Sequence, residues 1–309
     1  MTLNDFKIKT LELDDDYEGR VVATLISSKF NKPEQTPVLY LHGFNDYFFQ
    51  VRLAEHFHDH GYNFHALDLR KYGRSILPHQ HPNYCRSITE YFEEINRSIE
   101  IIDSTQKQNI VLLGHSTGGL IASVYLNIGK YKDSVSTLIL NSPFLEFNIN
   151  FWQRYFLLPM AGIVSFFFPY AARKKPFSHL YGASISKKIY GEWDFNTSWK
   201  PVEGFPAYFK WIYAINRAQQ KLQKSSNIEI PILILHSDAS SNPKKWSDVI
   251  SRTDMVLNVD HIRELGLQLG REVTLAEIPE ALHDVFLSRE SIRKQAFEIM
   301  FDWLSSQKI

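Results

Sequence analysis

Short apolar runs, separated by amphipathic stretches, recur along most of the chain. From Pro37 onward the runs predict strands, and the stretches between or after them predict helices. This alternation predicts an α/β fold, a mostly parallel sheet covered by helices on both faces. The predicted strands are Val38–Leu41, Asn63–Leu67, Ile110–Leu113, Thr137–Leu140, Ile230–Leu235 and Val273–Ile278. The predicted helices lie near Gln50–His60, Ser87–Ser104, Gly118–Ile128, Asp260–Leu269 and Glu290–Leu304.

Two further runs near the start of the chain alternate apolar and polar residues. They cover Phe6–Leu13 and Arg20–Ser27, and the acidic turn Asp14-Asp15-Asp16 separates them. Alternation with a period of two is typical of a strand that turns one face toward a core. We therefore expect an antiparallel pair of strands at one edge of the sheet.

The segment between Phe144 and Tyr213 interrupts the alternation of strands and helices. It has no convincing strand, yet 21 of its 70 residues are Phe, Tyr or Trp. This composition predicts a helical, aromatic-rich cap at 144–225, inserted into a core formed by 1–143 and 226–309. A cap of this kind excludes water and lines an apolar pocket. A second small core with ordinary aromatic packing is the alternative, and the two interpretations are compatible.

Within this segment, Tyr155–Ala172 carries no charged residue over 18 positions. That length reaches the lower limit for a helix that spans a membrane. Pro159 and Pro169 each break or kink a helix, however, so an uninterrupted span is not expected. A helix of the cap is the favoured interpretation. Transient contact of the cap with a membrane surface stays open, and so does a dimer interface.

Composition limits the partners and the location. The 34 basic and 34 acidic residues give a formal net charge of zero, so nothing indicates a nucleic-acid partner. The single cysteine, Cys85, excludes an internal disulfide and suits a reducing compartment. The first twenty residues lack an apolar core and contain six acidic side chains, which argues against a signal peptide. We expect a cytoplasmic protein.

The most informative motif is Gly114-His115-Ser116-Thr117-Gly118, because of what flanks it. A buried strand, Asn109–Leu113, leads into the motif, and a helix that starts at Gly119 leads out. A strand–Gly-x-Ser-x-Gly–helix unit is typical of a nucleophile elbow, in which a strained turn exposes the serine Oγ at the sheet edge. The helix N-terminus directs backbone N–H groups toward developing negative charge. We predict that Ser116 is a nucleophile.

A serine hydroxyl is a weak nucleophile and needs a base, and the base needs an acid that orients it. In this arrangement the histidine follows the last strand. Val273–Ile278 is that strand, and His283 is the only histidine in the loop that follows it, Pro279–Asp284. We predict that His283 is the base.

The acid is harder to identify from the residues alone. Asp238 lies nearest the end of the strand Ile230–Leu235, whereas Asp254 lies further on and leads into the next helix. Asp248 lies between them. All three stay open on this reasoning.

Four motifs taken together resemble those of the α/β-hydrolases. They are Leu41-His42-Gly43, Leu67-Asp68-Leu69-Arg70-Lys71-Tyr72-Gly73-Arg74-Ser75, Gly114-His115-Ser116-Thr117-Gly118-Gly119 and Leu282-His283-Asp284. More narrowly, the chain is similar to the capped branch that contains monoacylglycerol lipases, lysophospholipases and serine aminopeptidases. The resemblance covers most of residues 37–300, and only the cap matches poorly. It implies a serine hydrolase with a Ser-Asp-His triad.

The resemblance also favours Asp254 as the acid. In the family, the strand is followed by a short turn, then by a segment similar to Asp-x-Val-Val-x-Pro, and then by a helix. Asp254-Met255-Val256-Leu257-Asn258-Val259 matches that segment, so Ser237–Thr253 is interpreted as an insertion into the turn. The 29 positions from Asp254 to His283 are typical of the family, whereas Asp238 would require 45. Asp238 remains the alternative acid.

An oxyanion hole combines the N–H of the residue after the nucleophile with one from the loop after an earlier strand. Thr117 supplies the first. Phe44 follows the strand that ends at Leu41, and Gly43 allows the tight turn that aims its N–H inward. The resemblance points to the same position. We predict Phe44 and Thr117 as the two donors.

Two other motif positions are interpreted as architecture rather than chemistry. Asp68 and Arg70 are expected to organise their loop through a carboxylate–guanidinium pair, and His42 is expected to shape the loop that follows it. The chain has no His-Glu-x-x-His, paired-cysteine or dinucleotide-binding motif, so no cofactor and no metal are expected.

The aromatic cap and the resemblance together favour a small-molecule acyl ester or lipid-like substrate, such as a monoacylglycerol, a lysophospholipid or a simple carboxylester. A serine aminopeptidase or amidase is the first alternative, and it needs an acidic anchor for the α-amine of its substrate. Carboxylates in the predicted cap are Glu146, Glu192, Asp194 and Glu203. A non-catalytic ligand-binding or scaffold protein is the second alternative, because folds of this type also serve such roles.

Overall fold

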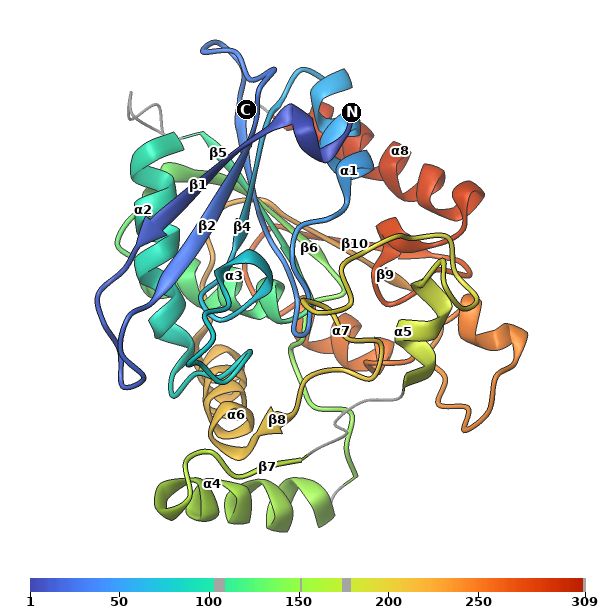
Figure 1. The fold of residues 1–309 in the computed structure, drawn as a ribbon. Helices are drawn as coiled ribbons and strands as arrows, with labels where there is room; N and C mark the ends of the chain where they lie inside the picture. Colours follow the sequence, from blue (N-terminus) through green and yellow to red (C-terminus); the bar gives the residue numbers. More distant parts are fainter. Residues whose placement is uncertain (103–108, 151, 174–178, 308–309) are drawn as a thin grey trace.

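The computed structural model describes residues 1–102, 109–150, 152–173 and 179–307. Its centre is an eight-stranded sheet in the order β1-β2-β4-β3-β5-β6-β9-β10 (Figure 1). The strands β1 and β2 pair antiparallel with each other, β2 pairs antiparallel with β4, and all later neighbours are parallel. The mostly parallel sheet and its antiparallel edge are therefore confirmed. The bounds are β1 Phe6–Glu12, β2 Val22–Ser28, β3 Pro37–Leu41, β4 Asn63–Asp68, β5 Ile110–His115, β6 Val135–Asn141, β9 Ile232–Ser237 and β10 Val273–Ile278.

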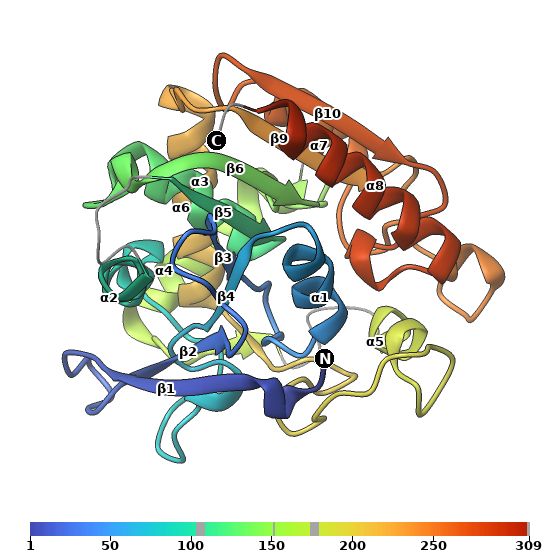
Figure 2. The ribbon, with the colours of Figure 1, turned by 90° about the horizontal axis from the view of Figure 1, so that it is seen from above.

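Helices cover both faces of the sheet. Successive strand residues point to opposite sides, so the buried strands present apolar side chains on both faces. In β3, Val38 and Tyr40 pack toward α1 and α8, whereas Leu39 and Leu41 pack toward α2, α3, α6 and α7. Figure 2 shows α1 and α8 on one side of the sheet and α2 and α3 on the other. The bounds are α1 Val51–Asp59, α2 Phe92–Ile102, α3 Thr117–Ile128, α6 Phe209–Ser225, α7 Val259–Gly266 and α8 Glu290–Ser306. Of the helix predicted at 87–104, the last two residues lie outside the described part of the chain.

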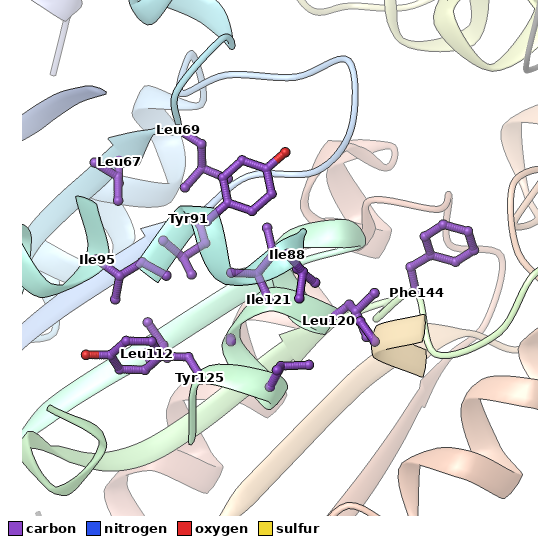
Figure 3. Packing of buried hydrophobic residues seen from close by; sticks show 14 of the residues in the cluster. Leu67, Leu69, Ile88, Tyr91, Ile95, Leu112, Leu120, Ile121, Tyr125 and Phe144 are labelled. Carbon is purple, nitrogen blue, oxygen red and sulfur yellow. The ribbon is translucent and has the colours of Figure 1, made fainter. Parts of the chain in front are cut away.

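The larger core cluster lies between the sheet and the helices α2, α3 and α6. Figure 3 shows Leu112 of β5 facing Ile121 and Tyr125 of α3 and Ile95 of α2. All four side chains are at most 1% exposed. This close packing fixes α3 against the sheet, and α3 begins directly after Ser116.

The chain between β6 and α6 forms the predicted aromatic-rich cap. It contains α4 (Leu158–Phe167), α5 (His179–Ile185) and a short ribbon in which β7 (Ala172–Arg173) pairs antiparallel with β8 (Ala207–Tyr208). The ribbon differs from the expectation of no strand, because two residues per strand are too few to give a pattern in the sequence. Figure 1 shows α4 on the side of α6 that faces away from the sheet.

Two features of the cap region bear on the sequence predictions. Pro159 is the second residue of α4 and directly follows a π-helical turn, Gln153–Leu157, and α4 ends at Phe167, before Pro169. Among the residues that the structure describes, no helix is long and apolar enough to cross a membrane. The helix α6 packs into the same core cluster as the sheet, so the last part of the segment 144–225 covers the sheet itself.

Candidate active site

Ser116 lies at the sharp turn between β5 and α3. Its backbone has φ 52° and ψ −115°, a strained conformation for a residue with a side chain. The N–H of Ser116 donates to the carbonyl oxygen of Asn141 at 3.0 Å, which ties the turn to the end of β6. A Cβ on Gly114 would lie 2.7 Å from the carbonyl oxygen of Gly118, and one on Gly118 would lie 2.3 Å from that of Leu41. A side chain at either position would clash with the neighbouring backbone, so both outer residues of the motif must be glycine.

The structure brings Ser116, His283 and Asp254 into one hydrogen-bonded chain. The Oγ of Ser116 lies 2.9 Å from Nε2 of His283, and Nδ1 of His283 lies 2.8 Å from Oδ2 of Asp254. The three residues are 7%, 3% and 0% exposed, respectively. A carboxylate can only accept here, so His283 donates from Nδ1, and Nε2 is left to accept the serine proton. This is the arrangement that activates a serine as a nucleophile.

Asp254 reaches this position because the loop 238–253, which follows β9, closes on itself. The N–H of Asp254 donates to the carbonyl oxygen of Ala239, and the N–H of Ser241 donates back to that of Asp254. The chain thus leaves the end of β9, loops out, and returns beside its own start. The N–H groups of Val256 and Leu257 then donate to Oδ1 of Asp254 at 2.7 and 2.8 Å, which orients the carboxylate toward His283.

The other two candidate acids lie elsewhere. Asp238 is exposed, and its Oδ1 accepts the N–H of Glu280 at 3.0 Å in the turn after β10. It therefore fastens the loop that carries His283 without touching the imidazole. Asp248 is exposed at the start of a short 3₁₀ turn.

Asp284, for which the sequence predicts no role, is fully buried next to His283. Its Oδ2 accepts from the amide of Gln50 at 2.6 Å, and its Oδ1 accepts from the amide of Asn141 at 2.7 Å. Asn141 also accepts the N–H of Val285 at 3.2 Å. These bonds join the loop after β10 to the end of β6 and to the start of α1, and so hold His283 over the serine. The acidic residue after the histidine was the only signal in the sequence.

The predicted oxyanion donors lie on the two sides of Ser116. Thr117 is the first residue of α3, so its N–H points out of the helix N-terminus. A Cβ built on Gly43 would lie 3.1 Å from Cβ of Ser116, so the chain entering Phe44 passes directly beside the serine. The ring of Phe44 packs against Trp211 of α6, with centroids 4.4 Å apart.

His42 holds this loop in place. Its Nδ1 donates to the carbonyl oxygen of Gly43 at 2.8 Å, and its Nε2 accepts the N–H of Leu69 at 3.1 Å. Burial lowers the pKa of His42, which keeps the ring neutral and both bonds intact. The architectural role predicted for His42 is confirmed.

The expected pair of Asp68 and Arg70 is wrong. Asp68 accepts the N–H of Phe48 at 2.8 Å and pairs with Arg74 at 2.7 Å, whereas Arg70 pairs with Glu94 on α2 at 2.7 Å. The chain turns at Lys71, which has φ 64°. Because of this turn, the side chain of Arg70 points toward α2, and that of Arg74 lies against Asp68. Asp68 still organises the loop, as predicted, but through a different arginine.

The cap reaches the site through α5. The ring of Tyr181 stands nearly perpendicular to that of His283, with centroids 5.7 Å apart. Together with the Phe44–Trp211 contact, this places aromatic surface around the nearly enclosed serine. In the described part of the chain, no three His, Cys, Asp or Glu side chains are grouped so that they could hold a metal ion.

A sequence model of the family described as serine aminopeptidase, S33, matches residues 32–290. No curated protein matches the chain.

Several solved structures share the fold over nearly the whole chain. A soluble variant of monoglyceride lipase from Saccharomyces cerevisiae has a TM-score of 0.71 and 18% identity, over 99% of this chain and 98% of that one. A monoacylglycerol lipase from Paleococcus ferrophilus has a TM-score of 0.66 and 17% identity, over 97% and 99%. A carboxyl esterase from Bacillus coagulans has a TM-score of 0.67 and 15% identity, over 96% and 98%. At these identities the likeness establishes an α/β-hydrolase fold.

Proposed function

Because the chain belongs to the serine aminopeptidase S33 family of hydrolases, we propose that it cleaves carboxylic esters of hydrophobic acyl groups through an acyl-enzyme on Ser116. The observation that carries the proposal is the continuous hydrogen-bonded chain from Ser116 through His283 to Asp254. Each member comes from a different loop at the carboxyl ends of the strands, where active sites of such sheets are found.

The mechanism uses these three side chains in turn. His283 Nε2 takes the hydroxyl proton while Ser116 Oγ attacks the ester carbonyl, and Asp254 stabilises the imidazolium that forms. His283 then gives the proton to the leaving alcohol as the tetrahedral intermediate collapses to the acyl-enzyme. Water, deprotonated by His283, attacks the acyl-enzyme, and the carboxylic acid leaves as Ser116 recovers its proton. We assign the oxyanion to the N–H groups of Phe44 and Thr117.

The acyl specificity rests on the aromatic surroundings of the site. Tyr181 lies against His283, and Trp211 lies against Phe44, so a bound acyl chain would meet apolar walls. Two of the solved structures with this fold are described as monoglyceride or monoacylglycerol lipases, one of them in complex with a substrate analogue, and a third as a carboxyl esterase in complex with glycerol. These descriptions support a small-molecule ester or lipid as the substrate class.

The experiment that tests this function is the initial hydrolysis rate of purified protein across p-nitrophenyl esters from acetyl to palmitoyl. We expect turnover that disappears in Ser116→Ala and an optimum at an acyl chain longer than acetyl. Equal rates in the wild type and in Ser116→Ala would overturn the proposal.

A serine aminopeptidase is the second candidate, because the family description names that activity. Such an enzyme needs a carboxylate free to bind an α-amine. Two of the cap carboxylates are engaged elsewhere, since Glu146 pairs with Arg154 and Glu192 pairs with Arg293. A panel of amino-acid amides decides between the two, and a clear preference for amides over esters would favour the aminopeptidase.

We further propose that the cap touches a membrane surface transiently, where lipid esters are presented. The supporting observation is a cluster of exposed apolar side chains on and beside α4, which are Trp152, Phe156, Leu157, Met160, Ile163, Phe166, Phe167 and Phe168. Apolar side chains on one face of a helix bind at the lipid interface in proportion to the area that they bury. Sedimentation with phosphatidylcholine vesicles tests this, and Phe166→Ser with Phe167→Ser should weaken it. Self-association in gel filtration without vesicle binding would instead favour a dimer.

We keep the proposed division into a core of residues 1–143 and 226–309 and a cap of 144–225. Because α6 packs against the sheet, two chains test the division, one in which a short linker replaces residues 144–225 and one in which it replaces only the residues before α6. Folding of the second chain alone would assign α6 to the core. The cytoplasmic location stays a prediction.

A further inference from the structure

The loop that follows the proposed oxyanion donor Phe44 is bound to the cap through a buried ion pair. Lys200 of the cap donates from Nζ to Oδ1 of Asp46 at 2.7 Å. Asp46 is 2% exposed and Lys200 is 7% exposed, and the ammonium also lies over the rings of Phe49 and Phe195. Most lysines are solvated, and burying one with a carboxylate costs desolvation that only good geometry offsets. The position of this pair therefore calls for an explanation.

Three further hydrogen bonds join the same two segments. The amide of Asn45 donates to the carbonyl oxygen of Pro201 at 3.0 Å and accepts the N–H of Phe205 at 3.1 Å. The hydroxyl of Tyr47 accepts the N–H of Asn196 at 2.7 Å. Residues 45, 46 and 47 are thus each held by the cap segment 196–205, immediately after Phe44. Asn45 has φ 52°, a conformation that external contacts of this kind can maintain.

The charge of Asp46 acts on the active site. Burial lowers the pKa of His115, the neighbour of Ser116, and among the charges that act on that ring, Asp46 raises its pKa and Lys200 lowers it. Both charges therefore lie within electrostatic reach of the nucleophile's turn. Asp46 is two residues after Phe44 in the chain, and a buried carboxylate there without its partner would oppose the negative charge that develops on the substrate oxygen.

We infer that Lys200 is a positioning residue, which acts through Asp46 to hold the Phe44 amide in place and to neutralise a carboxylate beside the oxyanion. The inference rests on the proposed function. It also means that the cap contributes to catalysis as well as to substrate binding, because a cap displaced at 196–205 would carry the loop 44–47 with it.

The test compares Lys200→Met with the wild type on a soluble p-nitrophenyl ester. We expect kcat to fall by about 10²-fold, the loss typical of one misplaced oxyanion donor, with KM changed by less than about threefold. Lys200→Arg should restore at least part of kcat, because a guanidinium can also pair with Asp46. The double variant Asp46→Asn with Lys200→Met should have a higher kcat than Lys200→Met alone, because it no longer contains the unpaired carboxylate.

Inhibition by a trifluoromethyl ketone supplies a readout that a merely structural role would not change. Its adduct with Ser116 places an oxyanion in the hole, so its affinity should fall in parallel with kcat across the variants. The matched control is Arg154→Met, which breaks the cap ion pair with Glu146 and should leave kcat and the inhibition constant unchanged. Circular dichroism and thermal unfolding establish that each variant is folded.

The outcomes separate this inference from the proposed function. Wild-type turnover together with an unchanged kcat in folded Lys200→Met would overturn the inference alone. A loss of kcat with unchanged affinity for the ketone would also overturn it, because the oxyanion would then be held as before. Absence of wild-type turnover on every ester and amide would overturn the proposed function and the inference with it.

Discussion

The carboxylate of Asp254 lies 2.8 Å from Nδ1 of His283, although the loop 238–253 separates it from β9. Two backbone hydrogen bonds join Asp254 to residues 239 and 241, so the end of the loop lies directly beside its start. These bonds tie the backbone of Asp254 to the chain just after β9, which fixes the position of the acid relative to the sheet.

The first prediction concerns this acid. Asp254→Asn should lower kcat by up to about 10⁴-fold, because an amide at this position favours the wrong imidazole tautomer and does not stabilise the imidazolium. Steady-state ester hydrolysis measures the loss.

Asp238→Asn is the matched comparison, since Asp238 contacts the loop of His283 without touching the ring. Its effect should be far milder. If Asp238→Asn proved the more severe variant, the assignment of the acid would be reversed.

The second prediction concerns the loop beside Ser116. A side chain at Gly43 would begin 3.1 Å from Cβ of Ser116 and 3.2 Å from the ring of His115, so Gly43→Val must displace the Phe44 amide. Loss of one oxyanion donor costs about 10²–10³ in kcat. Kinetics should be paired with thermal unfolding, and a folded Gly43→Val enzyme with normal kcat would show that Phe44 is not a donor.

The third prediction concerns stability in acid. Burial lowers the pKa of His65 from its ordinary 6.5 to about 4. Its neutral ring lies 2.8 Å from the hydroxyl of Ser27 and 3.1 Å from the amide of Asn31. Between pH 6.5 and pH 4, His65 is mostly protonated in the unfolded chain and mostly neutral in the folded chain. The free energy of unfolding should therefore fall as the pH drops from 6.5 toward 4. The ring's partial solvent contact limits this contribution to about 3 kcal/mol at most.

Urea unfolding of the wild type and His65→Gln at pH 7 and pH 4.5 checks this pH dependence. The variant should lose less stability between the two pH values. The same loss in both proteins would mean that His65 does not titrate in this range.

The fourth prediction concerns the single thiol. Cys85 is fully buried, and burial raises its pKa, so the reactive thiolate is suppressed in the folded protein. Ellman's reagent should not react with the native enzyme, and in urea the thiol should react at the rate of unfolding. Rapid labelling of the native enzyme together with loss of activity would contradict the buried position.

The sequence predicted those parts of the fold and site whose signals are local. An apolar run such as Ile110–Leu113 predicts a buried strand from its own residues, and the glycines of the turn around Ser116 lie within five consecutive positions. What escaped prediction depends on contacts between distant segments. The partner of Asp68 is set by a turn at Lys71, and the role of Asp284 is set by Gln50, which lies 234 residues away. The short strands of the cap have too few residues to leave a pattern.

The order of the strands has a consequence for synthesis of the protein. Ser116 follows β5 in the middle of the sheet, whereas His283 follows β10, an edge strand that comes much later in the chain. A chain emerging from the ribosome can form the turn around Ser116 once β3, β5 and β6 are available, since folding proceeds from the N-terminal side. The proposed base lies 167 residues after Ser116 and is therefore translated well after it. A nascent chain that ends before His283 holds Ser116 without its proposed base, so the proposed hydrolysis requires that β10 and the loop after it have been made.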